Sequence, residues 1–328
     1  MDFKGKTILI TGGTGSFGSN CIKRLLEEHE PQAIRLFSRD ELKQSELRGK
    51  YPDEDRLRFF IGDVRDRDRL IRATKGCDLI LHAAALKQVP ACEYNPFEAV
   101  QTNVLGAENV VAAAIENDVP CTLLLSSDKA VNPVNLYGAT KLCAEKILTQ
   151  GNSYATYSVA RFATARYGNV VGSRSSVVPI FMRQAEEGTL TITDERMTRF
   201  WITLPQAIDF VLARVKEMEG GEIFVPKIPS MRVTEIAEAI APDALRVFTG
   251  VRPGEKLHEV MLTEDESRHA RDLDDCYLIY PEFPTWRSEP YTAGEHVKEG
   301  FRYSSDRNTS WLTADELRGM LPALALAR

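Results

Sequence analysis

The sequence predicts an α/β fold, with a doubly wound parallel sheet and a smaller C-terminal substrate-binding domain. Two observations support this prediction. Through the first half of the chain, short β-rich runs alternate with amphipathic stretches that are long enough for crossover helices. The total of 328 residues suffices for one large domain or two fused units. The expected strands are residues 6–11, 33–38, 57–61, 78–82, 122–126 and 156–160.

The sequence pattern changes after about Asn169, where the elements become shorter and prolines more frequent. We therefore expect a nucleotide-binding domain over residues 1–168 and a mainly substrate-binding domain with a C-terminal tail over residues 169–328. A later strand at 222–225 and a helix are expected to return to the first domain. The irregular C-terminal stretch is expected to wrap onto the body of the protein.

Composition and charge exclude several classes of function. The net charge of −6 and the absence of a basic block give no reason to expect nucleic-acid binding. The first residues do not resemble a signal peptide, and no run of about 18 apolar residues predicts a membrane span. Six scattered cysteines without a CxxC pair favour reduced thiols in a cytoplasmic protein. The five histidines lack metal-ligand spacing, so we expect no metal site.

Three glycines follow the first expected strand, in the run GGTGSFG. Gly12, Gly15 and Gly18 have the spacing that permits a tight turn, close approach of a pyrophosphate and close packing of the next helix. A helix beginning near Ser16 would direct free backbone N–H groups at that phosphate. A glycine cluster alone is weak evidence, but after the first strand of a βαβ pattern it predicts a Rossmann-type dinucleotide site.

The end of the second expected strand indicates which dinucleotide binds. An acidic residue there would bind the ribose hydroxyls of NAD, but this chain has SRDELKQ. Arg39, with Lys43 one helical turn later, is placed to bind a 2′-phosphate, which favours NADP. The alternative is a solvated Arg39 at a helix start that Asp40 caps.

Further residues of the expected cofactor site follow the third and fourth strands. Asp63 is a candidate partner for the adenine amino group, and small residues from Ala83 would let the cofactor lie close to the backbone. For Asn103, a structural and a functional role are both open. The expected cofactor-binding residues are Gly12, Gly15, Ser16, Phe17, Gly18, Arg39, Asp40, Lys43, Asp63, Val64, Ala83, Tyr137, Lys141 and Arg174.

The run SSDKAVNPVNLYGATK contains the candidate catalytic residues. Tyr137 and Lys141 are four residues apart, so a helix places them on one face, where the lysine would lower the pKa of the tyrosine. Such a tyrosine can take a proton from a substrate hydroxyl. Asp128 and Lys129 after Ser127 add a second acid and base, which favours a dehydratase over a plain dehydrogenase. The alternative for this pair is a surface ion pair.

Several motifs carry a family resemblance. TGGTGSFG, GDVRD, HAAALKQVPACEYNPFEAV and YxxxK resemble the extended short-chain dehydrogenase/reductase superfamily. LSSDKAVNPVNLYGATK, RYGNVVGSRSSVVPIF and RPGEKLHE resemble, more narrowly, the UDP-N-acetylglucosamine 4,6-dehydratases that invert carbon 5 and begin pseudaminic acid synthesis. The resemblance extends from Lys6 to about Glu259 and resumes in GFRYSSDRNTSWL. Ser127 stands where threonine is usual, and Lys129 matches the inverting subgroup.

The resemblance implies a redox cycle within one active site. Tyr137 would take the proton of the sugar 4-hydroxyl while hydride passes to NADP and later returns to carbon 6. Lys129 would remove the carbon 5 proton, and Asp128 would protonate the leaving 6-hydroxyl. A lysine base must be partly neutral, so we expect burial or the cofactor charge to lower the pKa of Lys129. The resemblance also implies a homo-oligomer, a dimer or hexamer. Leu142 and Ile147 would offer an outer helix face for it, and the alternative is that they belong to the core of a single chain.

The substrate-side residues are placed by resemblance and by charge. Arg174 is expected near the cofactor or near the pyrophosphate of the sugar nucleotide, and Trp201 is expected in the core. UDP and N-acetylglucosamine follow from the resemblance alone. The remaining alternatives are a sugar-nucleotide epimerase or oxidoreductase, a retaining 4,6-dehydratase, and a non-enzymatic NADP-sensing or scaffold protein. The expected substrate-binding residues are Lys87, Asn169, Arg199, Arg252 and Glu255.

Overall fold

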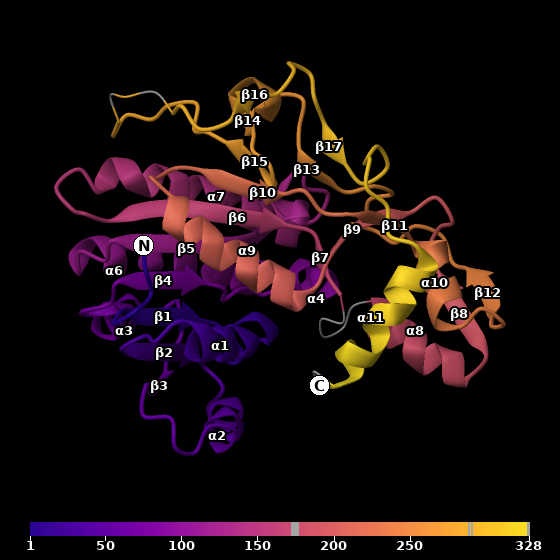
Figure 1. The fold of residues 1–328 in the computed structure, drawn as a ribbon, viewed down its shortest axis with the longest axis horizontal. Helices are drawn as coiled ribbons and strands as arrows, with labels where there is room; N and C mark the ends of the chain where they lie inside the picture. The colour runs from indigo at the N-terminus through magenta and orange to yellow at the C-terminus, as the bar shows by residue number, and fades with distance from the viewer. Residues whose placement is uncertain (172–176, 288, 290, 327–328) are drawn as a thin grey trace.

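A ten-stranded sheet runs through the computed structural model, which describes residues 1–171, 177–287, 289 and 291–326 (Figure 1). Six strands from the first half of the chain form its parallel part in the order β3-β2-β1-β4-β5-β6. This order is typical of Rossmann folds and reverses direction between β1 and β4. These strands are β1 (Thr7–Thr11), β2 (Ala33–Ser38), β3 (Leu57–Ile61), β4 (Leu79–His82), β5 (Cys121–Ser127) and β6 (Arg161–Tyr167).

Later segments of the chain extend this sheet. β10 (Ile223–Pro226) pairs parallel with β6, close to the range in which the sequence suggested a returning strand. Three antiparallel strands then complete the edge: β15 (Cys276–Ile279), β14 (Ala270–Asp272) and β16 (Glu295–His296). The C-terminal part of the chain therefore contributes to the main sheet itself.

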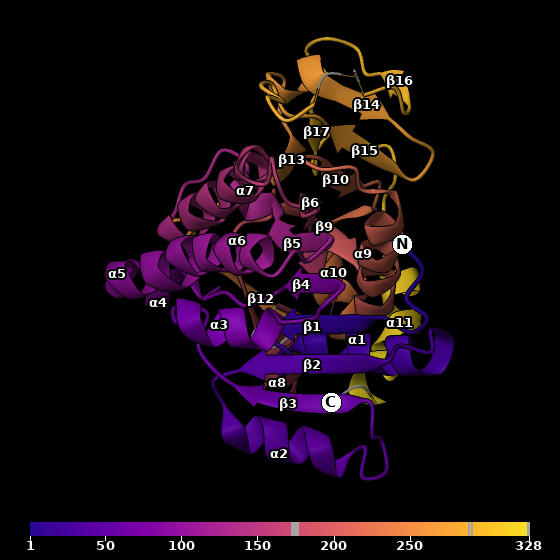
Figure 2. The ribbon, with the colours of Figure 1, turned by 90° about the vertical axis from the view of Figure 1, so that its left-hand side faces the viewer.

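Helices cover both faces of the parallel strands (Figure 2). α3 (Arg67–Thr74), α6 (Gly106–Glu116) and α7 (Leu136–Tyr154) pack on one face, and α1 (Ser16–Glu28) and α9 (Leu204–Glu217) on the other. β1 shows why both faces are covered, because its side chains alternate between the two cores. Ile8 and Ile10 pack with α1 and α9, whereas Leu9 packs with α3 and α6, and all three are fully buried.

Short elements connect the strands at the end of the sheet where the site lies. They are α2 (Glu41–Gly49), α4 (Val89–Tyr94), α5 (Pro96–Val100), the π-helical turn η1 (Gln101–Leu105) and the 3₁₀ turn η2 (Asp128–Ala130). η2 directly follows β5, and α7 begins soon after it at the N-cap Asn135. The two candidate catalytic pairs are thereby brought to one end of the same strand.

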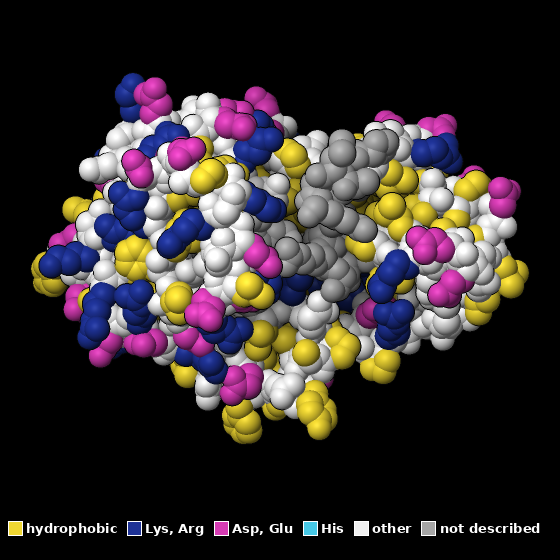
Figure 3. Space-filling model, turned by 90° about the horizontal axis from the view of Figure 1, so that it is seen from below, with side chains coloured by type: hydrophobic (Ala, Val, Ile, Leu, Met, Phe, Trp, Pro, Cys, Tyr) yellow, Lys and Arg dark blue, Asp and Glu magenta, His cyan; other side chains and the backbone are white. Residues whose placement is uncertain are grey.

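A smaller cluster of elements lies at one end of the molecule, at the right of Figure 1. Its apolar core includes Phe181, Ile192, Trp201 and Met231, and Trp201 is buried as expected. On the face in Figure 3, cationic and acidic side chains are interspersed. The elements beyond the main sheet are β7 (Asn169–Val170), α8 (Val177–Glu186), β8 (Thr189–Ile192), β9 (Thr198–Ile202), β11 (Ser230–Arg232), α10 (Val233–Ile240), β12 (Leu245–Phe248), β13 (Val260–Leu262), the 3₁₀ turn η3 (Glu266–His269), β17 (Tyr303–Ser304) and α11 (Ala314–Leu326).

The prediction of a sixth strand at residues 156–160 is wrong. α7 continues to Tyr154, the chain then turns, and Tyr157 is fully exposed. The strand instead runs over Arg161–Tyr167. Its Arg166 is buried in ion pairs with Glu145 and Glu266, a pairing that the local apolar pattern does not reveal. Among the described residues, no helix is both long and apolar enough to cross a membrane.

Candidate active site

A cavity of about 660 Å³ opens at the carboxyl ends of the parallel strands, near β1 and β4, between which the strand order reverses. This is the position at which doubly wound sheets bind ligands. Most of the residues expected from the sequence share this cavity. Those that line it are Gly12, Gly15, Ser16, Phe17, Arg39, Asp40, Lys43, Asp63, Val64, Ala83, Lys87, Ser127, Lys129, Tyr137, Lys141 and Asn169.

The turn between β1 and α1 forms a cradle that suits a dinucleotide. Gly12 has φ +66°, and a Cβ atom there would lie 3.0 Å from the backbone nitrogen of Ala84. No side chain caps the N-terminus of α1 at Gly15, so the first N–H groups of the helix remain available to a phosphate. Gly18, which lies in α1, does not line the cavity. A Cβ atom at Gly18 would overlap the backbone of Gly13.

At the end of β2, each candidate phosphate-binding cation has a carboxylate neighbour. Arg39 Nη1 lies 3.7 Å from Asp63 Oδ2, and Lys43 Nζ lies 2.7 Å from Asp40 Oδ2. Asp40 is also the N-cap of α2, where it accepts a hydrogen bond from the backbone N–H of Lys43 at 3.0 Å. Asp63 is held by Arg65, whose Nε donates to it at 2.9 Å. Asp40 therefore has the capping role that the sequence left open.

Asn103 has a structural role. Its side chain accepts a hydrogen bond from the Leu86 N–H at 2.8 Å and donates one to the Leu86 carbonyl at 2.9 Å. It also donates to Thr140 Oγ1 at 3.0 Å and is 2% exposed. Because Thr140 belongs to α7, Asn103 ties the loop that carries Lys87 to the helix that carries Tyr137.

Tyr137 and Lys141 lie in the first turns of α7, beside the 3₁₀ turn that contains Lys129. The close approach of α7 to this turn depends on Gly138, because a Cβ atom there would overlap the carbonyl oxygen of Lys129. Lys141 is 4% exposed, and its Nζ donates a 2.6 Å hydrogen bond to the carbonyl of Leu125. α7 is thus packed directly against the end of β5.

The expectation that Lys141 lowers the pKa of Tyr137 within the chain is wrong. Burial raises the pKa of Tyr137 to about 12, and the smaller opposing effects come from Lys129 and Ser127. Burial also lowers the pKa of Lys141 to about 8, against the charge of Glu145. The side chain of Lys141 is bonded to a backbone carbonyl, so its charge is not directed at the phenol alone.

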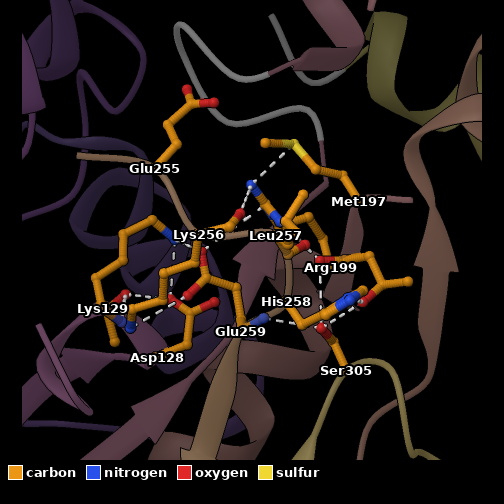
Figure 4. Close-up of polar contacts among 12 residues, drawn as sticks. Asp128, Lys129, Met197, Arg199, Glu255, Lys256, Leu257, His258, Glu259 and Ser305 are labelled. Carbon is orange, nitrogen blue, oxygen red and sulfur yellow. Dashed lines mark hydrogen bonds and ion pairs between the residues drawn. The ribbon is translucent and has the colours of Figure 1, made fainter. Parts of the chain in front are cut away.

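Asp128 and Lys129 form a partly buried ion pair rather than a surface one, since Asp128 is fully buried and Lys129 is 27% exposed (Figure 4). Asp128 Oδ1 accepts hydrogen bonds from Lys129 Nζ at 3.0 Å and from Ser127 Oγ at 2.7 Å. The Asp128 side chain is fully buried, does not line the cavity and leaves Oδ2 without a hydrogen-bond partner. Lys129 is the member of the pair that reaches the cavity.

The expectation of a lowered pKa for Lys129 is also wrong. Burial acts to lower it, but the charges of Asp128 and Glu259 outweigh that effect and raise the pKa above its usual value. Glu259 Oε1 lies 3.6 Å from Lys129 Nζ. Sequence reasoning missed Glu259 and its neighbour Lys256, although both stand in the RPGEKLHE motif. One local signal was available, since Glu259 directly precedes the fully apolar strand β13.

Three of the expected substrate-side residues do not line the cavity. Arg199 donates hydrogen bonds to the carbonyls of Thr198 at 2.7 Å and of Lys256 and Leu257 at 3.0 Å each. Arg252 is largely exposed and lies 3.7 Å from Glu255. The expected residue Arg174 lies outside the described residues.

Comparisons with known proteins agree with this geometry. Residues 8–281 match the family described as polysaccharide biosynthesis protein. The chain is 49% identical to the inverting UDP-N-acetylglucosamine 4,6-dehydratase of Campylobacter jejuni strain 81-176, over 96% of this chain and 97% of that protein. It is 40% identical to a UDP-glucose 4-epimerase of Rickettsia conorii, over 98% and 97% of the two chains.

A solved structure shows the same architecture over nearly the whole length. The X-ray structure of Pen from Bacillus thuringiensis covers 99% of each chain at 38% identity, with a TM-score of 0.90. The family match over residues 8–281 includes the glycine turn and all the residues that line the cavity. The chain therefore belongs to the polysaccharide biosynthesis protein family and has the fold of the extended short-chain dehydrogenases/reductases.

Proposed function

We propose that this protein is a UDP-N-acetylglucosamine 4,6-dehydratase that inverts carbon 5 of the sugar. One observation carries the proposal: Lys129, paired with the buried Asp128, lines the same cavity as Tyr137 and Lys141. Tyrosine and lysine suffice for oxidation of a hydroxyl, whereas loss of water needs a further acid and base. The 49% identical Campylobacter relative, which carries this name, supports the substrate and the stereochemical outcome.

The residues of the cavity suit NADP. The Gly12 cradle and the uncapped first turn of α1 offer space and N–H donors to a pyrophosphate. Arg39 and Lys43, which line the cavity at the end of β2, would bind the 2′-phosphate that distinguishes NADP from NAD. When bound, NADP takes a hydride from carbon 4 and returns one to carbon 6 within the same turnover.

Tyr137 acts on the sugar 4-hydroxyl as the proton acceptor. Its pKa of about 12 in the chain alone means that the phenolate needs further positive charge. Lys141 is already part of that chain, so the nicotinamide ring of bound NADP would have to supply it. Oxidation at carbon 4 makes the proton on carbon 5 acidic, because the resulting carbanion is conjugated with the ketone.

Asp128 and Lys129 then carry out the loss of water. Lys129 transfers a proton to Asp128 along their 3.0 Å hydrogen bond, which produces the neutral amine and the carboxylic acid that the step requires. The amine takes the carbon 5 proton. The acid gives its proton to the 6-hydroxyl through the hydroxyl of Ser127, which lies 2.7 Å from Asp128 and lines the cavity, and the 6-hydroxyl leaves as water. The pair ends the step as ammonium and carboxylate, its starting form.

On the substrate side, Lys87 and Asn169 line the cavity and are proposed to bind the sugar nucleotide. Arg199, Arg252 and Glu255 remain proposals for the outer part of the site. A cytoplasmic homo-oligomer, either a dimer or a hexamer, is part of the same proposal, with the partly buried Leu142 and Ile147 on α7 near the interface.

The second candidate function is a sugar-nucleotide 4-epimerase, which the Rickettsia relative supports. An epimerase needs Tyr137 and Lys141 but has no use for a buried Asp128–Lys129 pair. Mass spectrometry of UDP-N-acetylglucosamine after incubation with the purified protein separates the two candidates. A dehydratase product has lost one water, whereas an epimerase product has the mass of the substrate.

A further inference from the structure

Glu259 is a buried carboxylate that faces the catalytic lysine from the C-terminal half of the chain (Figure 4). The residue is 3% exposed and surrounded by three cations. Its Oε1 lies 3.6 Å from Lys129 Nζ and 3.8 Å from Arg199 Nε, and its Oε2 lies 3.6 Å from Lys256 Nζ. Oε2 has no hydrogen-bond partner, so the carboxylate is held in place by charge rather than by a full set of hydrogen bonds.

The backbone of Glu259 is fixed by the segment that follows β17. The Glu259 N–H donates to Ser305 Oγ at 2.9 Å, and the Ser305 N–H donates to the Glu259 carbonyl at 2.8 Å. Ser305 is fully buried and also shares a hydrogen bond with Thr198 Oγ1 at 2.7 Å. The C-terminal segment therefore sets the position of Glu259 relative to the cavity.

The charges around Lys129 show what this carboxylate contributes. Besides Asp128 and Glu259, the charged groups near Lys129 are Arg199 and Lys256, and the phenol of Tyr137 lies nearby. Arg199 is tied to three backbone carbonyls, and Lys256 Nζ donates to the Val131 carbonyl at 2.6 Å. Without Glu259, these fixed cations would repel the Lys129 ammonium with only Asp128 to oppose them.

We propose that Glu259 is a positioning residue that holds the Lys129 amino group between itself and Asp128 and keeps it a strong base at the cavity wall. The inference rests on the proposed dehydratase function. Glu259 is not a proton donor or acceptor in the cycle. It remains a carboxylate while Lys129 gives its proton to Asp128, and it stabilises the ammonium that forms when Lys129 takes the carbon 5 proton.

The test follows exchange of the carbon 5 proton of the 4-keto-6-deoxy product in deuterated water, by NMR from pH 6 to about 10.5. This reaction needs the base but no hydride transfer. The variant Glu259→Gln keeps the shape of the side chain and removes its charge. The matched control is Glu222→Gln, a buried glutamate that accepts hydrogen bonds from the Glu219 and Gly220 N–H groups.

We expect exchange by the wild-type protein and by Glu222→Gln to rise through the whole pH range. Exchange by Glu259→Gln should level off within this range, at a pH about one unit or more below the point at which the wild type would level off. Its highest exchange rate should be at least about tenfold below the highest wild-type rate. Glu259→Asp should keep the wild-type pH dependence, because the charge is present, with a reduced maximum. A general loss of rate in Glu259→Gln without a shift along the pH axis would overturn the proposal.

Thermal unfolding of each variant shows whether it is folded. If Glu259→Gln is unfolded, Glu259→Asp alone decides, and a wild-type maximum in that variant would overturn the positioning role. The two proposals fail differently. If the wild-type protein forms no dehydrated product, the proposed function is wrong, whereas normal wild-type turnover with identical profiles for both glutamine variants removes only the role of Glu259.

Discussion

Lys129 Nζ lies 3.0 Å from Asp128 Oδ1, in an ion pair of which one side chain is fully buried and the other is 27% exposed. Asp128 does not line the cavity, whereas Lys129 does, so Lys129 presents the pair to the cavity. The ion pair therefore holds an acid and a base in contact. Transfer of one proton along this hydrogen bond would produce the neutral amine of Lys129 and the carboxylic acid of Asp128.

Removal of the lysine tests this unit. Lys129→Ala should slow the loss of water by about 10²- to 10⁴-fold, which is the usual contribution of a general base. Binding of NADP, measured by fluorescence titration, should not change because the cradle at Gly12 is untouched. Lys75→Ala, at an exposed lysine after α3, serves as the control. Wild-type turnover by Lys129→Ala would remove this residue from the mechanism.

The proposed preference for NADP over NAD should depend on Arg39. A charge-assisted hydrogen bond contributes about 1.5–3 kcal/mol, so Arg39→Ala should weaken NADP binding by about 10- to 100-fold. NAD, which lacks the 2′-phosphate, should bind almost as before. Isothermal titration of both cofactors measures the difference, with Arg72→Ala on α3 as the exposed control. An equal loss for both cofactors would contradict the phosphate role.

The buried Lys141 should cost stability in return for activity. Its pKa in the folded protein is lowered to about 8, whereas the unfolded chain has the usual value of 10.5. The unfolded state therefore binds more protons between these values, and the penalty is full below pH 8 and fades as the pH rises to about 10.5. This difference of about 2.5 units corresponds to about 3 kcal/mol.

Lys141→Met removes this penalty but leaves the Leu125 carbonyl without its hydrogen bond, at a cost of about 1–3 kcal/mol. The variant should lose activity. The difference between its melting temperature and that of the wild type, variant minus wild type, should be larger at pH 7 than at pH 9.5. Calorimetry at both pH values measures this. A difference between the two proteins that does not depend on pH would show that Lys141 titrates normally.

Arg166 connects the catalytic helix with the C-terminal part of the chain. It forms ion pairs with Glu145 on α7 at 2.7 Å and with Glu266 at 2.9 Å, and its side chain and that of Glu145 are each 1% exposed. Arg166→Met leaves Glu145 buried without a partner, so it should reduce the free energy of unfolding by about 3–5 kcal/mol.

The double variant Arg166→Met/Glu145→Leu removes the stranded charge as well and should recover part of that loss. Urea unfolding of the wild type, both single variants and the double variant gives the coupling between the two residues. Additive losses would show that Arg166 and Glu145 act independently.

Local patterns in the sequence predicted much of the fold and part of the site. The first five strands follow from apolar runs, and the cofactor turn and the Tyr137–Lys141 pair follow from fixed short spacings. The sixth strand was misplaced because Arg166 is satisfied by partners 21 and 100 residues away along the chain. No local pattern contains such a pairing.

The electrostatics of the site also could not be predicted from the sequence. Burial raises the pKa of Tyr137, and the charges of Asp128 and Glu259 raise that of Lys129. Glu259 reaches Lys129 only because β13 and the segment at Ser305 fold back to η2. Spacing within a motif predicts which side chains share a helix face. It does not predict the charges that a distant segment brings to them.

The central claim is the loss of water at carbons 5 and 6 with inversion at carbon 5. Proton NMR of the purified protein with UDP-N-acetylglucosamine in deuterated water tests it directly, with no reductant added. We expect a new methyl signal, deuterium at carbon 5 and coupling constants of the L-arabino configuration. A methyl product with the D-xylo configuration would contradict inversion, and a substrate that gains no methyl signal would contradict the dehydratase itself.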